Sequence, residues 1–121
     1  MNIKVINTNG EKIAVVRSNE IMITDVQSAL DLMATVSYEV GCNRIVINKS
    51  AISEDFFDLK TRLAGEILQK FINYQTKIAI VGDYSSYSSK SLKDFIYESN
   101  NGKDIFFLST EEQAIEKLSS I

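Results

Sequence analysis

The stretch Lys77-Ile78-Ala79-Ile80-Val81-Gly82-Asp83-Tyr84 decides the fold of this chain. A short apolar run indicates a buried strand, the glycine ends it, and a loop rich in Ser and Tyr leads into a helical pattern. Such junctions place backbone amides and polar side chains at the carboxyl end of a parallel sheet, where α/β proteins usually bind their ligands. The stretch therefore predicts an α/β architecture and the place of a binding site, but no particular reaction.

The composition indicates one globular domain. The chain has 121 residues, of which 45% are hydrophobic and 24% are charged. This length and balance are typical of one compact unit with a single core. The sequence has no proline and only five glycines, so it offers no linker and no low-complexity run. We expect a single domain over residues 1–121.

Charge and residue types argue against several classes of function. A net charge of −3 leaves no broad positive surface for nucleic acid. With no histidine and one cysteine, a zinc or haem site and an intrachain disulfide lack their ligands, and we expect Cys42 to be structural. No apolar segment resembles a signal peptide or a membrane span. We expect a cytoplasmic protein without cofactor, nucleic-acid or membrane partner.

Hydrophobic periodicity predicts the order β-β-α-β-α-β-α-β-α. Asn9-Gly10 lies between two alternating runs and is a strong hairpin signal, because both residues tolerate a positive φ. The remaining strands are continuous apolar runs at residues 44–47, 77–81 and 104–108. Repeated strand-helix units require right-handed crossovers, so we expect a mixed, mostly parallel sheet. The strand order cannot be read from the sequence.

The helices are predicted from apolar residues at helical spacing. The first is expected to begin at a Thr24–Gln27 capping box and to end at Gly41, and the last begins at a Thr110–Gln113 box. The third ends at Asn100-Asn101-Gly102. Because the later strands do not alternate, both sheet faces should be covered. We expect helices on one face and the hairpin or a second subunit on the other, which favours a homodimer.

Ser53 fits the N-cap of a long second helix that extends to Ile72. Gly65 inside this helix predicts close packing against a neighbour. Asp58 can pair with Arg62, and Arg62 with Glu66, each at i,i+4 spacing on the surface. Glu54, Asp55 and Asp58 are acidic, but without further ligands they do not predict a metal site.

The loop from Gly82 to Ser91 resembles a phosphate-binding loop only in part, because its second glycine is missing. Free amides at the start of the following helix, with Lys90 nearby, suit a small anion. The alternative is that Ser88, Ser89 or Ser91 merely caps the helix. For a ligand-binding crevice at the strand ends we predict a polar lining made of Asn48, Lys60, Arg62, Asp83, Tyr84 and Lys90.

Several stretches carry a family resemblance. The segment from Phe56 to Phe71, together with Ile80–Asp83, Ser89–Leu92 and Asp94–Asn100, resembles the bacterial domain-of-unknown-function family 4180. The similarity extends over nearly the whole chain. It implies membership of that family but no activity.

A more distant resemblance concerns the fold. The segments Ala79–Asp83 and Phe106–Ala114 are similar to the STAS and sporulation anti-sigma-factor-antagonist group, which implies a β/α superhelical fold and binding of protein partners. In those antagonists a phosphorylated serine follows a strand-terminal aspartate at a helix start. The matching junction here has Asn48 in place of the aspartate and lacks the following glycine. At this junction Ser50 or Ser53 occupies the approximate place of the phosphorylated serine and is the candidate that the resemblance implies.

Two functions follow as hypotheses. The first is a small regulatory module that binds a protein partner, with a small anion as a further ligand. The alternative is an enzyme or small-molecule binding protein that uses Asp83, Tyr84 and Arg62 in the strand-end crevice. In the enzyme, Asp83 or Glu66 is the general base and Tyr84 or Lys60 the acid or electrostatic stabiliser. We favour the first.

Overall fold

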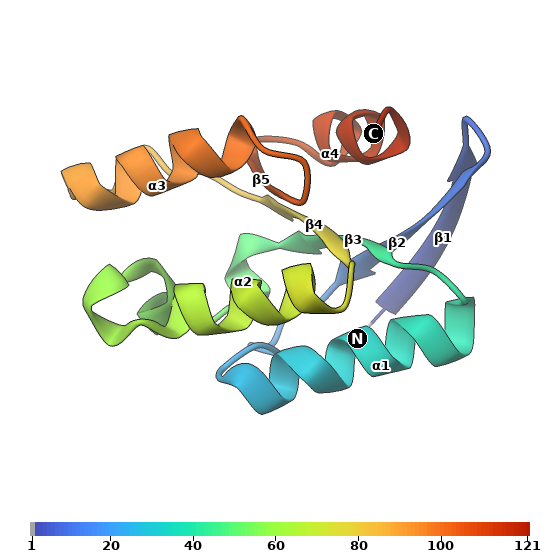
Figure 1. Cartoon of the computed structure of the whole chain (residues 1–121), viewed down its shortest axis with the longest axis horizontal. Helices are drawn as coiled ribbons and strands as arrows, with labels where there is room; N and C mark the ends of the chain where they lie inside the picture. Colours follow the sequence, from blue (N-terminus) through green and yellow to red (C-terminus); the bar gives the residue numbers. More distant parts are fainter. Residues whose placement is uncertain (1) are drawn as a thin grey trace.

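A computed structural model describes residues 2–121 (Figure 1). Five strands form one sheet: β1 (Asn2–Thr8), β2 (Glu11–Arg17), β3 (Arg44–Asn48), β4 (Lys77–Val81) and β5 (Ile105–Leu108). Four α-helices accompany them: α1 (Val26–Val40), α2 (Leu63–Asn73), α3 (Lys90–Asn100) and α4 (Glu111–Ser119). Three short 3-10 turns lie between β3 and α2: η1 (Lys49–Ala51), η2 (Glu54–Phe57) and η3 (Leu59–Thr61). The predicted single α/β domain with a mixed, mostly parallel sheet is confirmed.

The order of strands in the sheet follows the order in the chain, from β1 to β5. β1 and β2 are antiparallel, and every later pair is parallel. The hairpin turn has φ of 53° at Asn9 and 78° at Gly10, so the predicted turn is confirmed. Because β2 to β5 run in one direction, their carboxyl ends meet at a single edge of the sheet.

Both faces of the sheet are covered within the chain. α1 and α2 lie side by side on one face, where α3 also packs, and α4 lies on the opposite side (Figure 1). Beneath α4, the side chains of Val15, Val46 and Phe106 are almost completely buried together with Ala114 and Leu118 of the helix. This face was expected to be left for the hairpin or a second subunit. α4 covers it instead, so the exposed-face argument for a homodimer no longer holds, although the dimer itself stays a prediction.

Polar contacts hold α4 against the sheet. The guanidinium of Arg17 donates to both carboxylate oxygens of Glu111, at 2.6 and 2.8 Å. Arg44 donates to the backbone oxygens of Leu118 and Ile121, near the end of the helix. Because α4 is tied at both ends, it belongs to the core of the fold rather than to a mobile tail.

The long second helix predicted from Ser53 is wrong. Residues 54–61 form η2 and η3, and α2 begins only at Leu63. The reason is competition from side chains: the hydroxyl of Thr61 donates to the backbone oxygens of Asp55 and Asp58, and Asp58 accepts from the amide of Lys60. These bonds satisfy backbone groups that a continuous helix would pair.

Two further expectations for this segment also fail. Arg62 has a φ of 64° at the junction, and within residues 2–121 its side chain makes no ion pair with Asp58 or Glu66. Gly65 is exposed, and a Cβ built on it would meet nothing within 4 Å. The close packing predicted at Gly65 is therefore wrong.

The remaining helix ends are close to their predicted places. The capping box of α1 joins Asp25 and Ser28, one residue later than expected, and Gly41 ends the helix with a φ of 69°. Thr110 caps α4 as predicted. Cys42 is buried and donates to the backbone oxygen of Arg44. Within the described residues, no helix combines the length and the apolar character that crossing a membrane requires.

Candidate functional site at the carboxyl edge

Side chains at and after the ends of β3 and β4 form a partly exposed group at the carboxyl edge of the sheet. We call it the carboxyl-edge surface, and it consists of Asn48, Lys49, Ser50, Glu54, Asp83 and Tyr87. The side chain of Asn48 is held by two hydrogen bonds to the backbone of Ser18. Its amide oxygen accepts from the N–H of Ser18 at 3.0 Å, and its amide nitrogen donates to the backbone oxygen of Ser18 at 2.8 Å. These bonds tie the end of β3 to the end of β2.

Lys49 is the centre of this surface. Its ammonium group lies 3.1 Å from Glu54 Oε1, 4.8 Å from the ring centre of Tyr87 and 4.9 Å from that of Phe57. Tyr87 also donates to Glu54, at 3.0 Å. A cation over aromatic rings is attracted by their negative faces, and the carboxylate adds a charge-assisted bond. The long lysine side chain is therefore held in one conformation rather than left free in water.

Gly82 makes this arrangement possible. A Cβ at position 82 would lie 2.6 Å from Lys49 Cβ and 2.9 Å from Lys49 Cδ. Both distances are far shorter than a carbon–carbon contact. The absence of a side chain at Gly82 thus lets the stem of Lys49 run across the end of β4.

The charges of the surface stabilise one another. Burial opposes the charge of Lys49, but hydrogen bonds to Tyr87 and Glu54 outweigh it and raise its pKa. Burial, aided by Glu54, raises the pKa of Tyr87. Hydrogen bonds from Ser85 lower the pKa of Asp83, and the nearby Lys49 adds to this shift. At neutral pH the surface therefore presents the ammonium group of Lys49, the ionised carboxylate of Asp83 and the neutral phenol of Tyr87.

The six residues predicted as a polar lining do not converge. Asn48 and Asp83 lie at the carboxyl edge, where β3 and β4 end, and Asp83 is near Lys49. Lys90, exposed at the start of α3, pairs with Asp94 at 2.7 Å. Lys60 and Arg62 are exposed in and after η3, and in residues 2–121 their side chains have no hydrogen-bond or ion-pair partner. At the start of α3, Ser89 accepts from the amide of Leu92, which matches the simple capping alternative.

Tyr84 has a structural role in this fold. Its hydroxyl donates to the backbone oxygen of Ile80 at 2.6 Å, and its ring packs edge-to-face on Phe107. Burial, with a smaller contribution from Tyr87, raises the pKa of Tyr84 well above its usual range. A phenol that is partly buried and already donates its proton to the backbone is poorly suited to protonate a substrate.

The two candidate phosphorylation residues differ in their surroundings. Ser50 is exposed in η1, and its hydroxyl accepts from the side-chain amide of Asn48 at 2.6 Å. Ser53 is half-buried and caps η2 by accepting from the amide of Asp55. A phosphate on Ser53 would lie beside the carboxylates of Glu54 and Asp55, which repel it. Ser50 is therefore the better placed of the two.

Three cavities found among the described residues are not lined by any residue of this surface. A cavity of about 480 Å³ lies in the groove between α1 and the end of α2, and one of about 390 Å³ lies between α2 and α3. A third, of about 640 Å³, lies between β5 and α4. None of the three is lined by a residue of the predicted crevice. In the described part of the chain, no three His, Cys, Asp or Glu side chains are grouped as a metal ion requires.

Sequence reasoning missed the residues that organise the surface. Lys49, Glu54 and Tyr87 come from β3–α2 and β4–α3 segments, and their meeting depends on the adjacency of β3 and β4. One signal was available. A glycine directly after a central strand often marks a close approach by another part of the chain, and at Gly82 the approaching group is Lys49.

Comparison with known proteins gives a family and little else. The family model described as "Domain of unknown function (DUF4180)" matches residues 8–118, which is most of the chain. Neither the curated proteins nor the solved structures contain a match. The match supports the predicted family, and it assigns no ligand, partner or reaction.

Proposed function

We propose that this chain, which belongs to the DUF4180 family of domains of unknown function, is a regulatory module that binds a protein partner through its carboxyl-edge surface. One observation carries the proposal: Lys49, Glu54 and Tyr87 are held in a fixed, partly exposed arrangement by their mutual contacts. Fixed side chains lose little conformational entropy on binding. Tyr87 is partly exposed, and tyrosine is enriched at protein interfaces.

The surface suits a macromolecule better than a small substrate. A small substrate needs a concave site that excludes water and holds a group with a suitable pKa. Asp83 is exposed and its pKa is lowered, so it stays ionised and is a weak base at neutral pH. The enzyme alternative with Asp83, Tyr84 and Arg62 stays a prediction, and these features do not favour it.

The consecutive strand order supports the distant resemblance to STAS-like regulators, since successive parallel strands with crossover helices on one face make a β/α superhelix. This likeness concerns the fold, and function must be argued from the site. By that resemblance, Ser50 or Ser53 occupies the approximate place of their phosphorylated serine, and the exposure of Ser50 favours it of the two. A phosphate there would add about 1.5 to 2 negative charges to the surface and change its complementarity to a partner.

A small anion is a secondary part of the proposal. Lys49 is the cation at the centre of the surface, and its ammonium group is already paired with Glu54 at 3.1 Å. An anion bound there must displace that carboxylate. We therefore expect a negatively charged side chain of the partner, rather than a free anion, to compete with Glu54.

The test is a comparison of variants purified gently from the native cells. Tyr87→Ala and Ser50→Asp change the surface, whereas Tyr38→Ala removes a 92%-exposed tyrosine from α1 and is the matched control. We expect one protein to accompany the wild type and Tyr38→Ala and to be lost with Tyr87→Ala or Ser50→Asp. Equal recovery with all four proteins would refute the proposed surface.

A further inference from the structure

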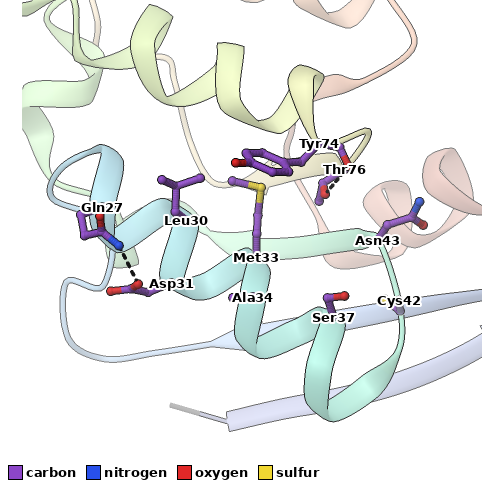
Figure 2. A pocket seen from close by; sticks show the side chains of 10 residues that line it. All are labelled: Gln27, Leu30, Asp31, Met33, Ala34, Ser37, Cys42, Asn43, Tyr74 and Thr76. Atoms are coloured by element: carbon purple, nitrogen blue, oxygen red, sulfur yellow. Dashed lines mark hydrogen bonds between the residues drawn. The ribbon is translucent and has the colours of Figure 1, made fainter.

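The groove between α1 and the end of α2 holds a cavity of about 480 Å³ that the proposed function does not use. Figure 2 shows the cavity with the ring of Tyr74 lying against the thioether of Met33, Gln27 and Asp31 toward the start of α1, and Asn43 and Thr76 toward its end. Its size is in the range of small-molecule sites, which usually measure about 300–1,000 Å³.

The cavity combines an apolar wall with a few polar groups. The wall is formed by Leu30, Met33 and Ala34 of α1 and by Tyr74, whose side chain is 65% exposed. Thr76 lines the cavity although it is only 7% exposed. The one hydrogen bond of its hydroxyl is a long contact of 3.4 Å to the backbone oxygen of Tyr74, so its acceptor capacity is unused. A ligand group that donates to the hydroxyl oxygen of Thr76 therefore displaces no protein donor from it.

The lining of the cavity carries a negative charge and no positive charge. Asp31 is the one charged residue among the ten that line the cavity, and there is no lysine or arginine. The side-chain amide of Gln27 donates to Asp31 Oδ1 at 2.9 Å and fixes the carboxylate beside the groove. The second carboxylate oxygen has no protein donor in the described chain. The aromatic ring of Tyr74, which is 65% exposed, also attracts cations.

We propose that this cavity binds a small organic amine, in which an apolar or aromatic body lies along Leu30, Met33 and Tyr74 and a protonated nitrogen pairs with Asp31. Anionic ligands are disfavoured, because the lining offers them a carboxylate and no cation. The site is independent of the carboxyl-edge surface, because none of its lining residues belongs to that surface.

The test uses three probes of one shape and different charge: 4-phenylbutylamine, 4-phenylbutanol and 4-phenylbutyrate. Each is titrated into the full-length isotope-labelled protein at neutral pH, and amide chemical shifts are recorded. We expect shifts around Asp31, Met33 and Tyr74, with dissociation constants on the order of 1 mM for the amine, as befits a small fragment. The alcohol should bind several-fold more weakly and the carboxylate more weakly still.

Two variants separate charge from shape. Asp31→Asn keeps an oxygen that can accept from Gln27 but removes the negative charge, so the amine should lose its advantage over the alcohol. Ala34→Phe fills the mouth from an exposed helix position and should weaken both probes. Gln69→Ala, in the separate α2–α3 cavity, is the control and should leave binding unchanged.

Three results would overturn the inference. Shifts that map to another part of the chain would place the binding elsewhere. An amine that binds no better than the carboxylate, or that binds Asp31→Asn as tightly as the wild type, would remove the charge argument. The absence of saturable shifts with both the amine and the alcohol would show that the cavity is not a binding site for this class.

Discussion

The carboxyl-edge surface and the α1–α2 cavity differ in how their side chains are held. At the surface, Asn48 and Lys49 are fixed by hydrogen bonds and aromatic contacts, and no described cavity reaches them. In the cavity, Met33 and Tyr74 surround an open space, and Thr76 keeps unused bonding capacity. One of the three cavities reaches the carboxyl end of β5 at Leu108 and Ser109, but none is lined by Asn48, Lys49 or Asp83. We therefore expect a protein partner to bind at the carboxyl-edge surface and a small ligand to bind in the α1–α2 cavity.

The largest effect should come from the glycine beneath Lys49. Gly82→Ala places a methyl group 2.6 Å from Lys49 Cβ, so the lysine or the strand end must move. We expect the free energy of unfolding to fall by about 2 kcal/mol, as for overpacking in other proteins. Chemical denaturation of the purified variant measures this change.

Gly65→Ala is the matched control, because its new Cβ meets nothing within 4 Å and α2 gains a better helix former. We expect this variant to be stabilised by about 0.5–1 kcal/mol. If both alanine variants change stability by the same amount and sign, Gly82 has no special role beneath Lys49.

A smaller loss is expected at Asn48. Asn48→Ala removes two hydrogen bonds to the backbone of Ser18 and one to the hydroxyl of Ser50. Because the Ser18 bonds are partly buried, the free energy of unfolding should fall by about 1.5 kcal/mol. Asn43→Ala, at the opposite edge, removes a single exposed bond to Gln75 and should cost less than about 0.5 kcal/mol. Equal losses in thermal or chemical unfolding would mean that the carboxyl edge is no more firmly held than the amino edge.

Tyr84→Phe tests whether Tyr84 is structural. The change removes one partly buried hydrogen bond to the backbone oxygen of Ile80 and keeps the ring packing on Phe107. We expect the unfolding free energy to fall by about 1 kcal/mol, with partner recovery unchanged. Loss of the partner at unchanged stability would instead give the hydroxyl of Tyr84 a direct binding role.

The smallest effect concerns pH. Hydrogen bonds from Ser85 lower the pKa of Asp83 in the folded state, so its carboxylate stabilises the fold above the ordinary carboxyl pKa. This contribution is lost as the pH falls through the lowered value, below about pH 4. Asp83→Asn should therefore make the acid-side decline in stability slightly shallower. A steeper decline in acid unfolding curves would show that the sign is wrong.

Much of the fold was predictable because local patterns determine it. Asn9-Gly10 fixes the hairpin and Gly41 ends α1, and both do so through a backbone conformation that few residues adopt. The segment from Glu54 to Thr61 was misjudged, because bonds from Asp58 and Thr61 to the backbone override the helical spacing of its apolar residues.

The arrangement in space was less predictable. The strand order and the covering of the second sheet face by α4 depend on contacts between distant segments, and an apolar stripe does not say which face it will cover. The α1–α2 cavity could not be predicted from the sequence for a related reason. Leu30 and Ala34 have the spacing of core residues, yet Ala34 is exposed and Leu30 only half-buried, so they line a groove.

The residues predicted to form one site lie at different places in the fold, and the site itself stays a prediction. Asn48, Ser50 and Asp83 do lie at the carboxyl edge, since residues after parallel strands must gather there. Lys60, Arg62 and Lys90 do not converge with them, because 3-10 turns replace the start of the expected helix and Lys90 pairs with Asp94.

The most direct measurement is a native mass spectrum of the protein purified gently from its own cells, which reads subunit composition, phosphate and retained small molecules together. The expected result is an assembly that contains a second kind of protein chain, and that is lost when Tyr87 is changed to alanine. A spectrum that contains only copies of this chain, with or without a bound small molecule, would contradict partner binding at the carboxyl-edge surface.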